Sequence, residues 1–347
     1  MGDPIRRVPE GASRPLARDL DTPYARSSRP ALDQRGARLV YSIPMTTRFR
    51  GITVREGMLL RGDAGWGEFS PFLEYDDPTS APWLAAAREA ADLGFPQPVR
   101  GRVPVNVTVP AVGPEQAAAI VARGGCRTAK VKVAEPGQTL AEAEERIAAV
   151  RDGLGADGRI RVDANGGWTV DEAVVAIGRL DRAAGGLEYV EQPCRTVEEL
   201  AAVRRRVDVP VAADESIRRA DDPYRVRDLE AADVAVLKVQ PLGGVRACLR
   251  IAEDIGLPVV VSSALETSVG IAAGVALAAA LPELEYACGL ATVQLLERDV
   301  VDEPLLPVDG FLPVRQPAVS AAVEDCLAPP DRLDHWTDRL ARVEVVP

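Results

Sequence analysis

Seven polar residues recur along the sequence at intervals of roughly 25, about the length of one strand plus one helix in a parallel barrel. Each stands at or near the end of a short apolar run that is typical of a buried strand. Because the carboxyl ends of parallel strands meet at one edge of a barrel, we expect these side chains to converge at its mouth. They are Asn106, Lys132, Asp163, Glu191, Asp214, Lys238 and Ser262.

Three of these residues are acids on consecutive predicted strands: Asp163, Glu191 and Asp214. Three carboxylates held close together repel one another and would not all ionise without a cation. Oxygen ligands without histidine or cysteine suit Mg²⁺, with water and substrate completing about six coordination positions. The sequence therefore predicts a Mg²⁺ site, which Mn²⁺ could also fill.

Lysines are expected on both sides of this metal site. Lys130 and Lys132 stand two residues apart in the stretch Thr128–Glu135, so a strand would point both ammonium groups to the same face. Lys238 would lie on the other side of the acids. A nearby divalent ion and neighbouring ammonium groups lower the pKa of a lysine, so that it can accept a proton. This arrangement fits removal of a proton α to a carboxylate, with the metal stabilising the resulting enediolate.

Each of these residues alone has an ordinary structural explanation. An aspartate after a strand, such as Asp163, is commonly a helix N-cap, and Lys130 could be an exposed edge residue. The combination favours chemistry, because residues of suitable type follow one another on consecutive predicted strands at one spacing.

Composition narrows the class of protein. The sequence has 41 basic and 52 acidic residues, and its net charge of −11 argues against nucleic acid or an anionic membrane as a partner. We expect a cytoplasmic protein that acts on a small carboxylate; the sequence does not fix its oligomeric state. Five widely spread cysteines predict neither disulfides nor a zinc site. The single histidine, His335, lies in a polar stretch, so acid–base work falls to Lys, Asp, Glu or Tyr.

The elements that must position these residues alternate regularly between residues 101 and 304, where we expect a barrel domain. Apolar runs predict eight strands, and helices fill the intervals; eight strands close into a parallel barrel, whereas an open doubly wound sheet would need a glycine-rich fingerprint that is absent. The apolar run Val269–Leu281 predicts a buried helix. The predicted strands are Val103–Val107, Thr128–Ala134, Arg159–Asp163, Glu188–Glu191, Val211–Asp214, Val234–Val239, Pro258–Ser262 and Tyr286–Gly289.

Both ends of the chain are expected to build a second, smaller domain. Residues 39–100 indicate an α+β unit, in which two strands surround a basic loop, Thr46–Glu56, that carries Arg48, Arg50 and Arg55. Residues 305–347 contain a predicted helix and should fold back to complete this capping domain. Residues 1–38 are rich in Arg, Pro, Ser and Asp without an apolar core, which predicts a flexible tail and not a targeting segment.

The candidate residues resemble the motifs of the enolase superfamily, muconate-lactonizing subgroup. This resemblance spans about residues 40 to 315. It implies a modified (β/α)₈ TIM-type barrel under an α+β capping domain. It also implies Asp163, Glu191 and Asp214 as Mg²⁺ ligands and Lys132 and Lys238 as the acid–base pair. A lysine base beside Mg²⁺ is already known for this superfamily. The motifs are Lys130-Val-Lys132, Asp163-Ala-Asn165, Glu191-Gln-Pro193, Asp214-Glu-Ser216 and Lys238.

Within the subgroup, the sequence is most similar to o-succinylbenzoate synthases of actinobacterial type. The stretches that carry the similarity include Trp66-Gly-Glu-Phe-Ser-Pro71, Arg161-Val-Asp-Ala-Asn165 and Ser262-Ser-Ala-Leu-Glu-Thr-Ser268. The resemblance implies a lyase that dehydrates a succinyl-bearing hydroxycyclohexadiene carboxylate on the route to menaquinone. In that family, the residue matching Lys132 takes the proton and returns it to the departing hydroxyl, while the one matching Lys238 stays cationic. The tail before about Arg38 has no counterpart in the family pattern.

Other activities remain open at this point. An N-acylamino acid racemase would use the same two lysines, a muconate-type cycloisomerase is a weaker alternative, and a barrel that only binds an acidic metabolite is a non-enzymatic one. Residues 286–292 lack the Asp-x-Asp with which dipeptide epimerases hold an amine, which argues against a peptide substrate. The candidate substrate contacts are Lys130, Asn106, Arg161, Ser262 and Ser263.

Overall fold

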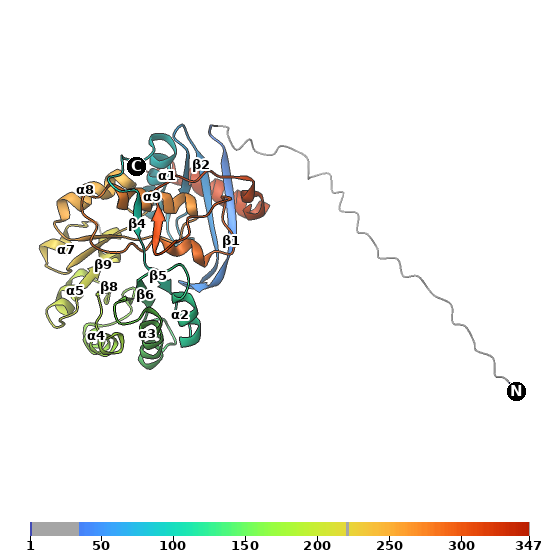
Figure 1. The fold of residues 1–347 in the computed structure, drawn as a ribbon. Helices are drawn as coiled ribbons and strands as arrows, with labels where there is room; N and C mark the ends of the chain where they lie inside the picture. Colours follow the sequence, from blue (N-terminus) through green and yellow to red (C-terminus); the bar gives the residue numbers. More distant parts are fainter. Residues whose placement is uncertain (2–34, 220–221, 347) are drawn as a thin grey trace. The chain divides into compact units, whose positions relative to one another are not determined.

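Seven parallel strands curl around the centre of the computed structural model, which describes residues 1, 35–219 and 222–346. Each strand pairs with the next one along the chain, and helices cover the outside of the sheet (Figure 1). Sheets of this kind are buried on both faces, which is why their strands are almost continuously apolar. The strands are β5 (Val107–Val109), β6 (Thr128–Lys132), β7 (Arg159–Asp163), β8 (Tyr189–Glu191), β9 (Val211–Ala213), β10 (Val234–Leu237) and β11 (Val259–Val261).

The predicted eighth strand closes the ring through two isolated parallel bridges. Gly289 pairs with Ser262, just after β11, and Cys288 pairs with Val105, just before β5. The N–H of Gly289 donates to the carbonyl of Val261 at 2.8 Å, and the N–H of Asn106 donates to the carbonyl of Cys288 at 2.9 Å. The predicted α/β barrel is therefore confirmed, with its last strand reduced to these bridges.

The first predicted strand, Val103–Val107, is wrong in its extent, because the chain changes pairing partners within it. β4 (Arg102–Pro104) pairs antiparallel with β12 (Phe311–Pro313), and the barrel strand β5 begins only at Val107. Asn106 consequently lies before the first barrel strand and not at its end. The polar residue of β5 that pairs in register with Lys130 is Thr108.

The helices of the outer layer begin at recognisable caps. Thr139, Thr169 and Thr196 each form a capping box with a glutamate three residues later. The run predicted as a buried helix is α9 (Ser268–Ala280), which is apolar all round and buried over nearly its whole length. No helix in the described residues is long and apolar enough to cross a membrane. The layer comprises α2 (Pro114–Val121), α3 (Leu140–Leu154), α4 (Val170–Ala184), α5 (Val197–Arg204), α6 (Glu215–Arg218), α7 (Arg225–Asp228), α8 (Val245–Ile255) and α9 (Ser268–Ala280).

An antiparallel sheet of three strands precedes the barrel. β1 (Arg38–Phe49) pairs with β2 (Ile52–Arg61), and β2 pairs with β3 (Trp66–Phe69). The loop predicted at Thr46–Glu56 is therefore wrong in length, because its β-branched and aromatic residues continue the strands and leave a turn at Arg50–Gly51. Both turn residues have positive φ, 50° and 80°. α1 (Asp77–Arg88) follows and runs into a π-helical turn, η1 (Glu89–Leu93).

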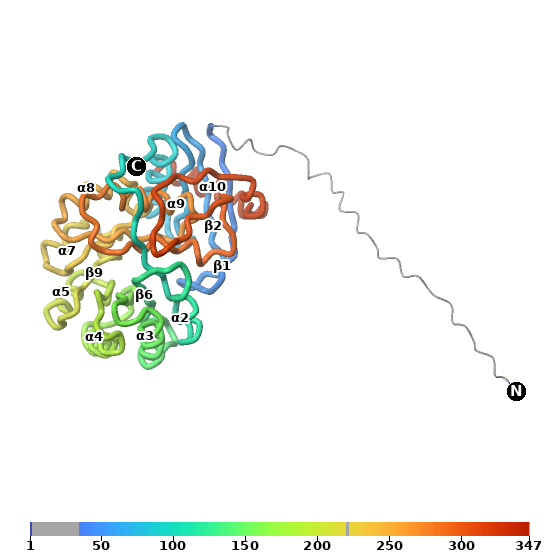
Figure 2. Tube along the Cα trace, viewed as in Figure 1, coloured from blue at the N-terminus to red at the C-terminus, as the bar shows by residue number. Residues whose placement is uncertain are grey.

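The C-terminal segment folds back onto this sheet, where its last helix contacts β1 and α1 (Figure 2). It contains η2 (Ala291–Leu295), β12, η3 (Ala321–Cys326) and α10 (Pro330–Val343). Trp336 of α10 is fully buried, with its ring edge-on to Phe69 at 5.9 Å between centroids. The guanidinium of Arg339 donates to the carbonyls of Phe72 at 2.9 Å and Tyr75 at 2.8 Å. The two ends of the described chain thus share one apolar cluster. Residues 2–34 of the predicted tail lie outside the described part.

Replacing Trp336 with alanine tests the docking of α10. The substitution removes a fully buried ring, so the free energy of unfolding should fall by about 3–5 kcal/mol in urea titrations. Leu333→Ala on the same helix is the control; Leu333 is 46% exposed, and its truncation should change the free energy by less than about 0.5 kcal/mol. Equal effects of the two substitutions would contradict the packing described here.

Candidate active site

Strand register brings the predicted acids and lysines to one level of the barrel. Lys130 and Lys132 alternate with apolar residues on β6, so both side chains point inward. Lys132 pairs across the sheet with Asp163 of β7, and Asp163 pairs with Glu191 of β8. Asp214 directly follows β9, and Lys238 directly follows β10. All six side chains are buried, although each is charged in its ordinary state at neutral pH.

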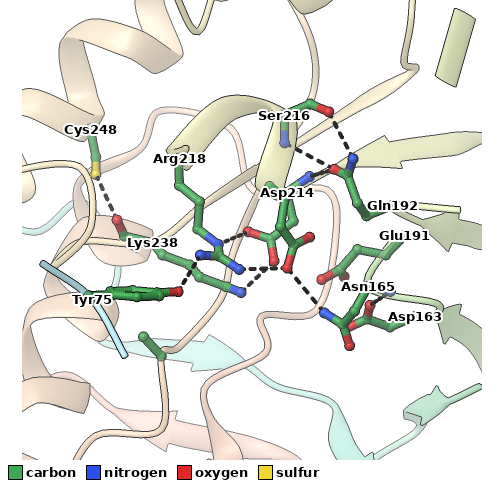
Figure 3. Close-up of polar contacts among 12 residues, drawn as sticks. Tyr75, Asp163, Asn165, Glu191, Gln192, Asp214, Ser216, Arg218, Lys238 and Cys248 are labelled. Atoms are coloured by element: carbon green, nitrogen blue, oxygen red, sulfur yellow. Dashed lines mark hydrogen bonds and ion pairs between the residues drawn. The ribbon is translucent and has the colours of Figure 1, made fainter. Parts of the chain in front are cut away.

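Each carboxylate contacts a cation that comes from a different strand or helix. The ammonium nitrogen of Lys130 lies 2.9 Å from Glu191 Oε1 and 3.3 Å from Asp163 Oδ2. The ammonium nitrogen of Lys132 lies 2.6 Å from the same Asp163 oxygen. Asp214 is held from two sides, at 2.6 Å by Lys238 and at 2.8 Å by Arg218. Figure 3 shows the three carboxylates facing a common space, with Lys238 and Arg218 beside Asp214.

Burial and charge shift the pKa values of these groups in opposite directions. Burial alone would raise the pKa of Asp163 and Asp214, but the neighbouring cations outweigh it and hold both pKa values well below their usual range. Glu191 is the exception: burial and repulsion from Asp163 raise its pKa to about 7. Burial lowers the pKa of Lys132, with a contribution from Lys130, although Asp163 opposes it. The pKa of Lys130 is raised, because Glu191 and Asp163 outweigh its desolvation.

The donor set fits a divalent cation of the Mg²⁺ class. Its members are three buried carboxylates on adjacent strands, with no histidine or cysteine among them. The pKa of Glu191 is raised by burial and then by repulsion from Asp163, and a divalent ion at the carboxylates would offset both effects. Within the described residues, however, no three acidic, histidine or cysteine side chains are already spaced to hold an ion, because the carboxylates turn toward the ammonium groups. Metal binding would require these ion pairs to rearrange.

Residues that follow the acids keep the carboxylates in place. The side-chain oxygen of Gln192 accepts hydrogen bonds from the backbone N–H groups of Asp214 at 3.0 Å and Ser216 at 3.1 Å, which ties the end of β8 to the end of β9. Asn165 accepts a short hydrogen bond from Lys132. Both Gln192 and Asn165 have positive φ, 41° and 47°, a strained conformation for such residues. Arg218, which contacts Asp214, also donates to the hydroxyl of Tyr75 at 3.2 Å.

A small cavity of about 30 Å³ lies above the lysines, with room for only a few water molecules. Thr108 and Thr292 add polar groups that sequence reasoning missed, and Asn165 adds one from the motif that follows Asp163. Phe49, Arg50 and Phe72 add a wall from outside the barrel. The Phe49 ring centroid is 5.4 Å from the Lys132 ammonium, which contributes to the desolvation of this lysine. The basic loop noted in the sequence was the one available signal for this wall.

The predicted substrate contacts fall into two groups. Lys130, Ser262 and Ser263 line the cavity, and the Ser263 hydroxyl is hydrogen-bonded to that of Thr292 at 2.8 Å. Asn106 and Arg161 do not line it. Arg161 is fully buried inside the barrel, where it pairs with Glu188 and donates to the carbonyl of Ala287 at 2.6 Å. Asn106 accepts from Arg161 at 3.2 Å. Strand alternation points Arg161 inward, but deeper in the barrel than the mouth, so contact of this pair with a substrate stays a prediction.

Buried charges from β2 and β3 hold the barrel segment that lines the other side of the cavity. Arg55 is 2% exposed and donates to the carbonyl of Leu265 at 2.8 Å. Leu265 has a φ of 70°, which is strained for a leucine. Glu68 accepts from the backbone N–H groups of Thr267 at 3.1 Å and Gly270 at 3.0 Å. The first turn of α9 and the cavity wall before it are thus fixed from outside the barrel.

Known proteins share this fold. Residues 114–318 match the family model described as enolase C-terminal domain-like, and residues 40–91 match the one described as enolase N-terminal domain-like. The L-Ala-D/L-Glu epimerase from Bacillus subtilis has a TM-score of 0.70 and 24% identity, covering 82% of this chain and 97% of that one. A dipeptide epimerase from Enterococcus faecalis, solved with Mg and L-Leu-L-Tyr, has a TM-score of 0.68 and 23% identity, covering 82% and 97%. These matches define a barrel of the enolase superfamily, whose enzymes are typically metal-dependent.

Sequence relatives narrow the class further. The o-succinylbenzoate synthase of Thermobifida fusca is 67% identical over 307 residues, 88% of this chain and 91% of that protein. The o-succinylbenzoate synthase of Mycolicibacterium smegmatis is 57% identical over 315 residues, covering 90% and 96%. The chain therefore belongs to the o-succinylbenzoate synthase family, which confirms the resemblance found in its motifs.

Glu266, two residues before α9, is a buried acid beside the contacts between the barrel and the N-terminal sheet, and its titration can be tested. Burial raises its pKa from an ordinary value of 4.5 to about 7, and nearby Glu68 adds to the shift, while Arg55 opposes it. Between these two pH values the folded protein binds a proton that the unfolded chain has lost, so stability should fall as the pH rises. The loss attributable to Glu266 is at most about 3 kcal/mol.

Urea unfolding of Glu266→Gln and of the unsubstituted protein, measured from pH 4.5 to 8, checks this expectation. Because the amide does not titrate, the variant should lose less stability over this range. Titrating groups far from Glu266 behave alike in both proteins and cancel in the comparison. Parallel stability curves would show that Glu266 ionises as freely in the fold as in the unfolded chain.

Proposed function

We propose that this chain dehydrates 2-succinyl-6-hydroxy-2,4-cyclohexadiene-1-carboxylate to o-succinylbenzoate, as a carbon–oxygen lyase (hydro-lyase) in menaquinone biosynthesis. The observation that carries the proposal is the register of three buried carboxylates between lysines from β6 and from the end of β10. Family membership supports the choice of substrate, because the relatives with 57–67% identity are o-succinylbenzoate synthases.

Lys132 is the proposed base. Its neutral amine takes the proton from the ring carbon that bears the carboxylate, and the electron pair of that C–H bond moves toward the carboxylate. The same nitrogen, now an ammonium, gives the proton to the hydroxyl on the neighbouring carbon. That C–O bond breaks, water leaves, and the ring becomes aromatic. The lowered pKa of Lys132 favours the neutral form that the first step requires.

Two other lysines have supporting roles in this proposal. Lys238 remains an ammonium ion, held by Asp214 at 2.6 Å, and stabilises the negative charge that develops after proton removal. The ammonium group of Lys130 donates to both carboxylate oxygens of Glu191, at 2.9 and 3.0 Å, and the raised pKa of Lys130 keeps this lysine charged. It therefore serves to hold Glu191 and not to exchange protons.

Asp163, Glu191 and Asp214 are the proposed ligands of Mg²⁺, with Mn²⁺ as a substitute. When bound, the ion would supply positive charge for the substrate carboxylate and so acidify the neighbouring C–H bond. Ser262 and Ser263 are proposed to contact the substrate from the wall opposite β6. We also propose the division of labour expected from the sequence: residues 39–100 and 305–347 form the capping domain, and residues 101–304 carry the chemistry.

Racemisation of N-acylamino acids is the second candidate, because lysines on both sides of the acids could also remove and return a proton at a single carbon. Assays with both substrates separate the two. Dehydration by the purified protein supports the first proposal, and racemisation without dehydration contradicts it.

Substitution of Lys132 tests the proposed base. Lys132→Met should lower turnover by at least about 10⁴-fold, since one general base contributes ~10²–10⁴ and this residue acts twice. Lys132→Arg is the matched control, because arginine keeps a cation beside Asp163 but cannot lose its proton. If Lys132→Arg dehydrates the substrate at a near-normal rate, the residue acts through its charge alone and the assignment is wrong.

Removal of divalent cations tests the metal. Protein treated with a chelator should be inactive, and Mg²⁺ or Mn²⁺ should restore turnover. Added Mg²⁺ should also raise the melting temperature, because an ion that binds only the folded state stabilises it. An Asp163→Asn variant should lose this thermal shift. Restoration by Zn²⁺ alone would contradict a site built from oxygen ligands.

A further inference from the structure

The turn between β1 and β2 places an arginine at the cavity that the proposed mechanism does not use. Arg50 occupies this turn with a φ of 50°, and its side chain lines the cavity above the lysines. Its guanidinium carbon lies 4.5 Å from the centroid of the Phe72 ring. The guanidinium carbon of Arg55 lies 4.7 Å from the same centroid. One aromatic ring therefore contacts two arginines.

The two arginines differ in what they bind. Arg55 is buried, and its N–H groups are used by backbone carbonyls, among them those of Leu265 at 2.8 Å and Glu56 at 2.9 Å. Arg50 is only partly buried, and among the described residues its side chain has no hydrogen bond or ion pair. Arg55 is therefore a structural group, whereas the N–H groups of Arg50 are free to bind a ligand.

Arg50 also differs from the other cations that line the cavity. The lysines there are paired with acids: Lys130 with Glu191, Lys132 with Asp163, and Lys238 with Asp214. Arg50 has no such counterpart in the part of the chain that the structure describes. A guanidinium stacked on an aromatic ring is held in a defined orientation while its edge remains available, and it matches a carboxylate through two parallel hydrogen bonds.

We propose that Arg50 binds a second carboxylate of the substrate, the one at the end of its succinyl chain. This inference rests on the proposed function, which assigns the ring carboxylate to the acids and lysines at the mouth of the barrel. A dicarboxylate would then span the cavity between two positive regions. Arg50 would select substrates that carry a terminal carboxylate, and it would leave the proton transfers to Lys132.

Ligand binding isolates this contact. In the presence of Mg²⁺, calorimetric titration compares the product, o-succinylbenzoate, with 2-butanoylbenzoate, which lacks the terminal carboxylate. Arg50→Gln should weaken binding of o-succinylbenzoate by roughly 10- to 100-fold, the usual effect of losing a charge-assisted hydrogen bond. Binding of 2-butanoylbenzoate should change little. Arg50→Lys should recover part of the lost affinity, because it restores the charge without the bidentate geometry.

Arg48→Gln is the matched control, since Arg48 is an exposed arginine of the same hairpin that does not line this cavity. It should leave both affinities unchanged. In turnover assays Arg50→Gln should raise KM with kcat nearly constant, because the lost contact exists equally before and during the reaction. Equal weakening of both ligands, or no weakening of either, would overturn the inference. Failure of the unsubstituted protein to dehydrate its substrate would instead overturn the proposed function, so the two results are distinguishable.

Discussion

Repulsion among three buried carboxylates is the constraint on which the mouth of the barrel depends. The register of β7 and β8 fixes Asp163 beside Glu191, and Asp214 follows on the next strand. Burying these charges is unfavourable unless each has a partner, and the partners come from β6, α6 and the end of β10. The cations proposed for proton transfer and charge stabilisation are therefore also the groups that make the acidic cluster compatible with folding. The same contacts serve stability and chemistry.

The barrel alone does not complete this site. The segment after β11 that lines the cavity contains Leu265 in a strained conformation, and strain of this kind persists only where surrounding contacts over-determine it. Arg55 and Glu68, which belong to the N-terminal sheet, supply those contacts through hydrogen bonds to backbone groups. α10 in turn holds that sheet through Trp336 and Arg339. Both ends of the described chain thus contribute to the shape of the cavity.

The sequence was informative where one strand–helix unit repeats. The spacing of Lys132, Asp163, Glu191 and Asp214 follows from that repeat, and the structure brings these residues together. It was misleading where pairing changes within an apolar run, so that Asn106 was taken for the end of a strand that begins only at Val107 and carries Thr108. It could not reveal how the cavity wall is held in place, because Arg55 meets Leu265 across 210 residues and no local periodicity records such a contact.

The proposed substrate contact and the proposed proton transfers lie on different parts of the fold. Each acid or lysine at the barrel mouth is paired with another, so replacing one leaves a buried charge without its partner and disturbs the whole cluster. Among the described residues, Arg50 has no hydrogen bond or ion pair, and its guanidinium stacks on the ring of Phe72. On the proposal made for Arg50, changes at this turn would alter which substrate is bound while the acids and lysines keep their arrangement.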